Sequence, residues 1–199
     1  MKNLFAFFIF FVSQLIVAQA QEHKPQLLKE PANWEFERFT LPPEFAPGIS
    51  YKGAEELRFA PGMFNKDSAT YFTYAFVAQL DNITAISQTD IRDYLLNYYK
   101  GLCNITARDR KLMIDTSRIT AAVEKKKDIP ANETIYNASV NIFGVFADGA
   151  PVKLNLEVKV IMDAAAKRSY LVFIASPREK TDDVWKTLYR IQKDFTIPD

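Results

Sequence analysis

Residues 134–175 carry the most regular hydrophobic pattern of the chain, and this pattern constrains the fold more than any other feature. Apolar and polar side chains alternate over residues 136–142 and again over residues 152–160, with Asp148-Gly149 between the two runs. Side chains of a strand point alternately to opposite faces of a sheet, and Asp-Gly is a common turn pair. The pattern therefore predicts an antiparallel hairpin with one face exposed to water.

Further segments predict additional strands around this hairpin. Residues 170–175 are apolar throughout, which is typical of a strand inside a sheet or under a helix. In residues 71–80 both alternating sets of side chains are largely apolar, so we expect a central strand that is covered on both faces. Residues 34–41, which end at Pro42-Pro43, and residues 112–123 show weaker strand patterns.

Two other segments predict amphipathic helices. Ser87 and Asp90 have capping-box spacing, and apolar residues then recur with helical periodicity up to Leu102, so we expect this helix to end near Asn104. A second apolar stripe runs from Val184 to Phe195 behind a possible N-cap at Thr181. The order of the elements predicts an α+β fold, a mainly antiparallel β-sheet with the two helices packed on one face.

The tetrapeptide Phe-Ala-Pro-Gly occurs twice, at residues 45–48 and 59–62. Proline at the second and glycine at the third position of a turn favour type II geometry, so we expect two type II turns. The same aromatic-rich region could instead face a ligand. The candidate ligand-facing residues are Met63, Phe64, Tyr71 and Tyr74.

The N-terminus has the three regions of a signal peptide. Lys2 is the only charge in residues 1–20, residues 4–17 are almost entirely apolar, and Ala18-Gln19-Ala20 matches the cleavage pattern. The apolar run is shorter than the ~20 residues that cross a bilayer. We therefore expect a signal peptide at residues 1–20, a flexible lead-in at 21–33 and a single α+β domain at 34–199. The mature chain would be periplasmic or extracellular, without a membrane span.

Charge, cysteine and histidine counts exclude several functions. The chain has 25 basic and 24 acidic residues, and loss of Lys2 with the signal peptide would leave them balanced, which argues against a nucleic-acid partner. The single cysteine, Cys103, cannot form an internal disulfide, and the single histidine, His23, lies in the lead-in. These counts exclude nucleophile–histidine catalysis and zinc sites built on imidazole and thiolate. We therefore assign no catalytic residue, metal site or cofactor.

Three functions remain. The first is a non-enzymatic module that binds a small ligand or an envelope protein. The second is a carboxylate-dependent glycan hydrolase, for which Glu55, Glu56, Asp81 and Asp115 are candidate acids. The third is an assembly component that pairs with a partner through a sheet edge. Four asparagines also match the N-glycosylation pattern, which matters only if the source organism glycosylates exported proteins; these are Asn82, Asn104, Asn132 and Asn137.

Overall fold

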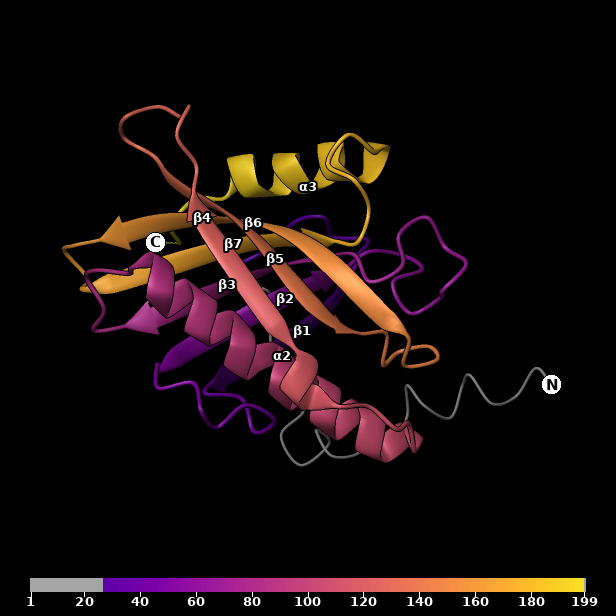
Figure 1. Cartoon of the computed structure of the whole chain (residues 1–199). Helices are drawn as coiled ribbons and strands as arrows, with labels where there is room; N and C mark the ends of the chain where they lie inside the picture. Colours follow the sequence, from indigo (N-terminus) through magenta and orange to yellow (C-terminus); the bar gives the residue numbers. More distant parts are fainter. Residues whose placement is uncertain (1–26, 199) are drawn as a thin grey trace.

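A seven-stranded antiparallel sheet forms the centre of the molecule, and a helix covers each of its faces (Figure 1). The computed structural model describes residues 27–198, so the expected signal peptide and His23 lie outside the described residues. Within residues 27–198, no helix is long and apolar enough to cross a membrane.

The strands form two groups that meet through one long-range pairing. The sheet order is β1-β2-β3-β7-β6-β5-β4, and every neighbouring pair is antiparallel. The β3–β7 pairing therefore joins the first three strands to the later four-strand meander. In chain order the elements are β1 (Glu35–Leu41), β2 (Gly53–Phe59), β3 (Tyr74–Asp81), α2 (Gln88–Arg110), the 3₁₀ helix η2 (Thr116–Arg118), β4 (Thr120–Lys125), β5 (Thr134–Phe143), β6 (Pro151–Asp163), β7 (Arg168–Ser176) and α3 (Asp183–Asp194).

The predicted hairpin is confirmed as β5 and β6. Val140 lies opposite Leu154 and Ala138 opposite Leu156, so the apolar sets of the two strands share one face. The fully apolar run becomes β7, which lies between β6 and β3 as expected for an interior strand. Strand β2 was not predicted, because Glu55, Glu56 and Arg58 interrupt any apolar alternation, yet all three side chains are buried.

Helix α2 begins as predicted and ends later than predicted. The side chain of Ser87 accepts a hydrogen bond from the Asp90 amide, and Asp90 accepts one from the Ser87 amide at 2.8 Å, which completes the capping box. The helix continues past Gly101 and ends at Arg110, and its C-cap Lys111 has a left-handed φ of 58°. Gly101 does not end the helix. It allows close packing, since a Cβ there would lie 2.0 Å from the Phe45 carbonyl oxygen.

The α+β class is confirmed, but the two helices lie on opposite faces of the sheet and not on one face (Figure 1). Tyr74 and Phe76 of β3 pack in the core under α2, whereas Ala75 and Val77 pack in the core under α3. Because β3 is apolar on both faces, each face needs a cover. One helix cannot provide both.

The two Phe-Ala-Pro-Gly turns differ in structure. In the second copy the Met63 amide donates to the Ala60 carbonyl at 2.9 Å and Gly62 has a φ of 87°, as a type II turn requires. In the first copy Gly48 does not have a positive φ, so the type II prediction is wrong there. A Cβ at Gly48 would instead lie 2.5 Å from Oδ1 of Asn97, so this glycine provides space beside α2.

Candidate functional site

Residues 27–34, which we call the N-terminal strap, run across the α3 side of the sheet and are held there by two buried charges of β2. The amides of Leu27 and Leu28 donate to Oε2 of Glu56 at 2.8 and 2.9 Å. Arg58 donates from Nε to the Leu28 carbonyl at 2.9 Å, and its two other nitrogens reach the carbonyls of Lys29 and Trp34. Residues 27–33, which the sequence suggested as a flexible lead-in, therefore contain buried side chains that belong to the folded domain.

The two buried charges of β2 that hold the strap, Glu56 and Arg58, have compensating partners. Glu56 is 0% exposed and Arg58 is 4% exposed. Arg38 of β1 forms an ion pair with Glu56, and the guanidinium of Arg58 lies 4.9 Å from the centre of the Phe36 ring. Burial lowers the pKa of Arg58, and the negative charge of Glu56 opposes this effect. Ionised groups are stable in a protein interior only with such partners, so the network determines where the strap lies.

A groove lies between the N-terminal strap and the C-terminal end of α3 with the residues that follow it. Its volume is about 680 Å³, within the range of roughly 300–1,000 Å³ that is usual for small-molecule sites. Apolar residues of the α3-side core contribute to it together with charged residues of the strap and helix. We call it the terminal groove; it is lined by Leu27, Leu28, Lys29, Glu30, Pro31, Asn33, Trp34, Thr187, Arg190, Ile191, Asp194, Phe195, Thr196, Ile197 and Pro198.

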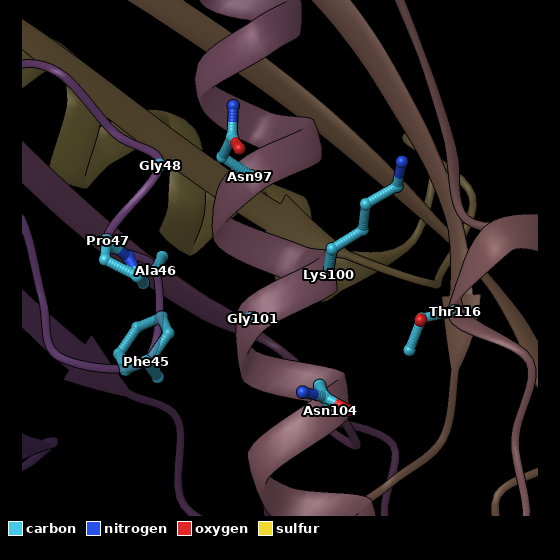
Figure 2. A pocket seen from close by; sticks show the side chains of 9 residues that line it. All are labelled: Phe45, Ala46, Pro47, Gly48, Asn97, Lys100, Gly101, Asn104 and Thr116. Carbon is cyan, nitrogen blue, oxygen red and sulfur yellow. The ribbon is translucent and has the colours of Figure 1, made fainter.

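A second, smaller depression lies beside α2 (Figure 2). Its volume is about 280 Å³, and it lies between the loop at residues 45–48, one side of α2 and Thr116. Figure 2 shows Asn97, Lys100 and Asn104 projecting from successive turns of the helix around it. Much of its wall is formed where Gly101 packs closely against the loop. The terminal groove has the larger volume and is therefore the better candidate for a ligand. All four sequon asparagines, including Asn104, are exposed.

The four predicted ligand-facing residues lie near one another in the α2-side core. Met63, Tyr71 and Tyr74 are buried and Phe64 is half-buried. They surround an aromatic group in which the rings of Phe64 and Phe72 each lie 5.1 Å from that of Phe146. None of the four lines the terminal groove or the depression beside α2. A ligand-facing role for them stays a prediction that neither cavity supports.

The four candidate acids of a hydrolase have separate environments. Glu55 and Glu56 are neighbours in β2 and therefore point to opposite faces of the sheet. Asp81 forms an ion pair with Arg168 at 3.1 Å, and Asp115 accepts a hydrogen bond from the Ser117 amide at the start of η2. Glu56, Asp81 and Asp115 thus each have a positively charged or backbone N–H partner.

Glu55 is the exception among the acids, since it lies in a cluster of tyrosines under α2. Its side chain is 0% exposed, and the Tyr94 hydroxyl donates to its Oε2 atom. Within the described chain, Oε1 has no hydrogen-bond partner. Burial raises the pKa of Glu55 to about 8, an effect that the tyrosine hydroxyls partly oppose. We call Glu55, Tyr74, Tyr94, Tyr98 and Tyr99 the acid–tyrosine cluster.

The sequence reading missed both the strap network and the acid–tyrosine cluster. Tyr94 and Tyr98 have the i, i+4 spacing of one helix face, which is the only sequence signal that relates them. Nothing in the sequence indicates that Glu55 lies opposite them, because β2 and α2 are joined through β3 and two loops. Cys103, expected in the core, is buried, and burial raises its pKa to about 11.

The sheet order identifies the two edges through which a partner strand could pair. These are β1 and β4, with seven and six residues. Charged residues occur on both, including Arg38 on β1 and Lys125 on β4, and Pro42-Pro43 follows β1. Charged side chains on both edge strands, and proline next to β1, discourage pairing with another sheet.

Among residues 27–198, no group of three or more histidine, cysteine, aspartate or glutamate side chains could hold a metal ion. No known protein family, curated protein or solved structure matches the chain. The candidate site therefore depends on the geometry of this molecule alone.

Proposed function

We propose that the chain is an exported, non-enzymatic binding domain that holds a small amphipathic ligand in the terminal groove. The observation that carries the proposal is the groove itself, with a volume of about 680 Å³ and a mixed apolar and charged lining. Small-molecule sites combine an apolar surface with a few polar groups that orient the ligand. Export rests on the signal-peptide pattern of residues 1–20.

The composition of the groove supports an amphipathic ligand. Trp34, Ile191 and Phe195 provide apolar surface that is continuous with the α3-side core. Lys29 and Arg190 add positive charge, Glu30 and Asp194 add negative charge, and all four are exposed. A ligand with an apolar body and a charged group would match these two features.

The N-terminal strap supports binding without rearrangement. Its backbone is tied to Glu56 and Arg58 by five hydrogen bonds of 2.8–3.1 Å. One wall of the groove is therefore fixed before a ligand arrives. A preformed site avoids much of the entropic cost of ordering a loop on binding.

The proposal is tested with anilinonaphthalene sulfonate, a fluorescent probe with an apolar body and one anionic group. We expect saturable binding to the wild-type protein, and at least tenfold weaker binding to Ile197→Asp, which places a negative charge at the groove. Ile197 is 36% exposed, so its substitution leaves the core intact. Binding is followed by dye fluorescence at constant ionic strength.

Met162→Asp is the matched control, because Met162 is an exposed apolar residue of β6 that does not line the groove. It should bind the dye like the wild-type protein. Equal loss of binding in both variants, or no saturable binding at all, would contradict the proposal.

A further inference from the structure

The acid–tyrosine cluster places one carboxyl group between the sheet and α2 without a positive charge beside it. The titratable groups that face Glu55 come from three elements. Glu37 lies on β1, Tyr74 lies on β3, and α2 contributes the remaining tyrosines. Cys103 of α2 lies beside Tyr74 and Tyr99 of the cluster. Each of these groups is neutral when protonated and negative when deprotonated, so none of them provides a positive charge. An ionised Glu55 would thus have no counter-charge in its surroundings.

The hydrogen bonds of the cluster connect β2 to α2. The Tyr94 hydroxyl reaches Oε2 of Glu55, and the Tyr74 hydroxyl is hydrogen-bonded to that of Tyr99. The ring of Tyr51, which precedes β2, lies 6.4 Å from that of Tyr94. The first half of α2 therefore contacts β2 and the segment before it through these polar aromatic side chains.

Removal of a proton from Glu55 changes the energy of this contact. A buried carboxylate without a compensating charge is strongly unfavourable, so the acid retains its proton while it stays buried. Burial accordingly raises the pKa of Glu55 from 4.5 to about 8, and burial also raises the pKa of Glu37. When α2 moves away, water reaches the carboxyl group and the acid ionises with an ordinary pKa.

We propose that Glu55 is a buried proton switch: the neutral acid holds α2 against the sheet, and loss of the proton releases the helix. The opening extends along α2 from Tyr94 to Cys103, and the α3 side of the sheet stays folded. Because the closed state binds one more proton than the open state, opening becomes easier as pH rises from 4.5 toward 8. The population of the open state rises about tenfold per pH unit within this window and is constant above it.

Cys103 provides a reporter of the opening. It is the only cysteine of the chain, lies on α2 and is fully buried, so a thiol reagent reaches it only when α2 opens. The test measures the rate at which dithionitrobenzoate labels Cys103 in the folded protein from pH 6 to pH 8. Glu55→Gln is the comparison, because an amide has the shape of the neutral acid and does not ionise.

We expect the ratio of the wild-type rate to the Glu55→Gln rate to rise about tenfold per pH unit. The ratio removes the intrinsic pH dependence of the thiol, which is common to both proteins. A ratio that does not change with pH would overturn the switch. A wild-type rate with the urea dependence of global unfolding would also overturn it, because a local opening exposes little surface and is almost independent of urea.

Tyr94→Phe keeps the proposal testable if Glu55→Gln does not fold. The Tyr94 hydroxyl opposes the rise in the pKa of Glu55, so its removal moves the upper end of the pH window to higher pH. Labelling of Tyr94→Phe should continue to accelerate, relative to a free thiol, at a pH where the wild-type rate no longer does. An upper limit that is unchanged or lower would contradict the role of Glu55.

Discussion

Oε2 of Glu56 accepts hydrogen bonds from the amide of Leu28, 28 residues earlier in the chain, and from the amide of Leu27. This contact joins the first described residues to the second strand of the sheet. It also gives a structural reason for a buried carboxylate that sequence reasoning had considered as a catalytic acid. The N-terminal strap, and with it the terminal groove, depends on this pair of elements.

The first prediction concerns the strap. Arg58→Met keeps much of the side-chain volume but removes the hydrogen bonds to Leu28, Lys29 and Trp34. We expect the free energy of unfolding to fall by about 3 kcal/mol, since three carbonyls of the strap, two of them buried, lose a charged donor. Urea denaturation measures the change.

Arg92→Met is the control for this substitution, because Arg92 is exposed and its ion pair is with the neighbouring Asp93. Its effect should stay within about 0.5 kcal/mol. If Arg58→Met is as mild as Arg92→Met, the strap is not held by Arg58.

The second prediction compares two glycines at the same contact. An alanine normally stabilises a helix by about 1 kcal/mol relative to glycine, but a Cβ at Gly101 would lie 2.0 Å from the Phe45 backbone oxygen. We expect Gly101→Ala to lower the free energy of unfolding by about 2 kcal/mol. A Cβ at Gly48 meets the end of the Asn97 side chain, which can rotate, so Gly48→Ala should cost about half as much or less.

Thermal denaturation of both glycine variants measures this difference. A Gly101→Ala protein that is more stable than the wild type would show that the loop and helix are further apart than the structure has them.

The third prediction concerns acid pH. The hydrogen bond from the Ser87 side chain lowers the pKa of Asp90 below 3.8, so its stabilisation is present above pH 3.8 and is lost as pH falls through the lower folded value. Ser87→Ala should cost about 1 kcal/mol at neutral pH and raise the pKa of Asp90. The difference from the wild type should shrink below pH 3.8. An NMR titration of Asp90 and urea denaturation at two pH values provide the measurements.

Thr89→Ala is the control for the cap, since Thr89 is an exposed residue of the same turn. A pKa of Asp90 that is the same in Ser87→Ala as in the wild type would contradict the capping box.

The fourth prediction concerns Glu157 of β6, which is 3% exposed and lies 3.1 Å from Lys126 and 3.7 Å from Lys180. Glu157→Gln removes the charge that compensates both lysines and should lower the free energy of unfolding by about 2 kcal/mol. Lys126→Met should cost less, because Lys180 still provides a positive charge. Equal costs would indicate that Lys180 does not interact with the carboxylate. Urea denaturation of the two variants distinguishes these outcomes.

The local elements of the fold were predictable, because their signals lie within a few residues. Alternation identified β5 and β6, and the spacing of Ser87 and Asp90 identified the start of α2. Strand β2 was not predictable in this way, since two charged side chains on one of its faces are paired with β1 and the strap. The sequence of β2 is as charged as that of a surface strand, but its charged side chains are buried like those of a core strand.

The candidate site was less accessible to sequence reasoning than the fold. The residues of the terminal groove come from both ends of the chain, and the partners of Glu55 lie on a helix about 40 residues later. The proposed ligand-facing residues were identified from an aromatic-rich region of the sequence, and three of the four, Met63, Tyr71 and Tyr74, are core residues. An aromatic side chain has the same sequence signal in a core and in a pocket.

Hydrophobic periodicity, turn pairs and caps thus determined most of the helices and strands and the α+β class, because each acts through neighbours along the chain. Tertiary structure alone decided that α2 and α3 lie on opposite faces, that Glu56 and Arg58 bind the strap, and that Glu55 is buried among tyrosines. The physical reason is that burial and charge compensation depend on which distant segments pack together. The sequence states the identity of a side chain, whereas the environment that sets its protonation and its contacts is created only by folding.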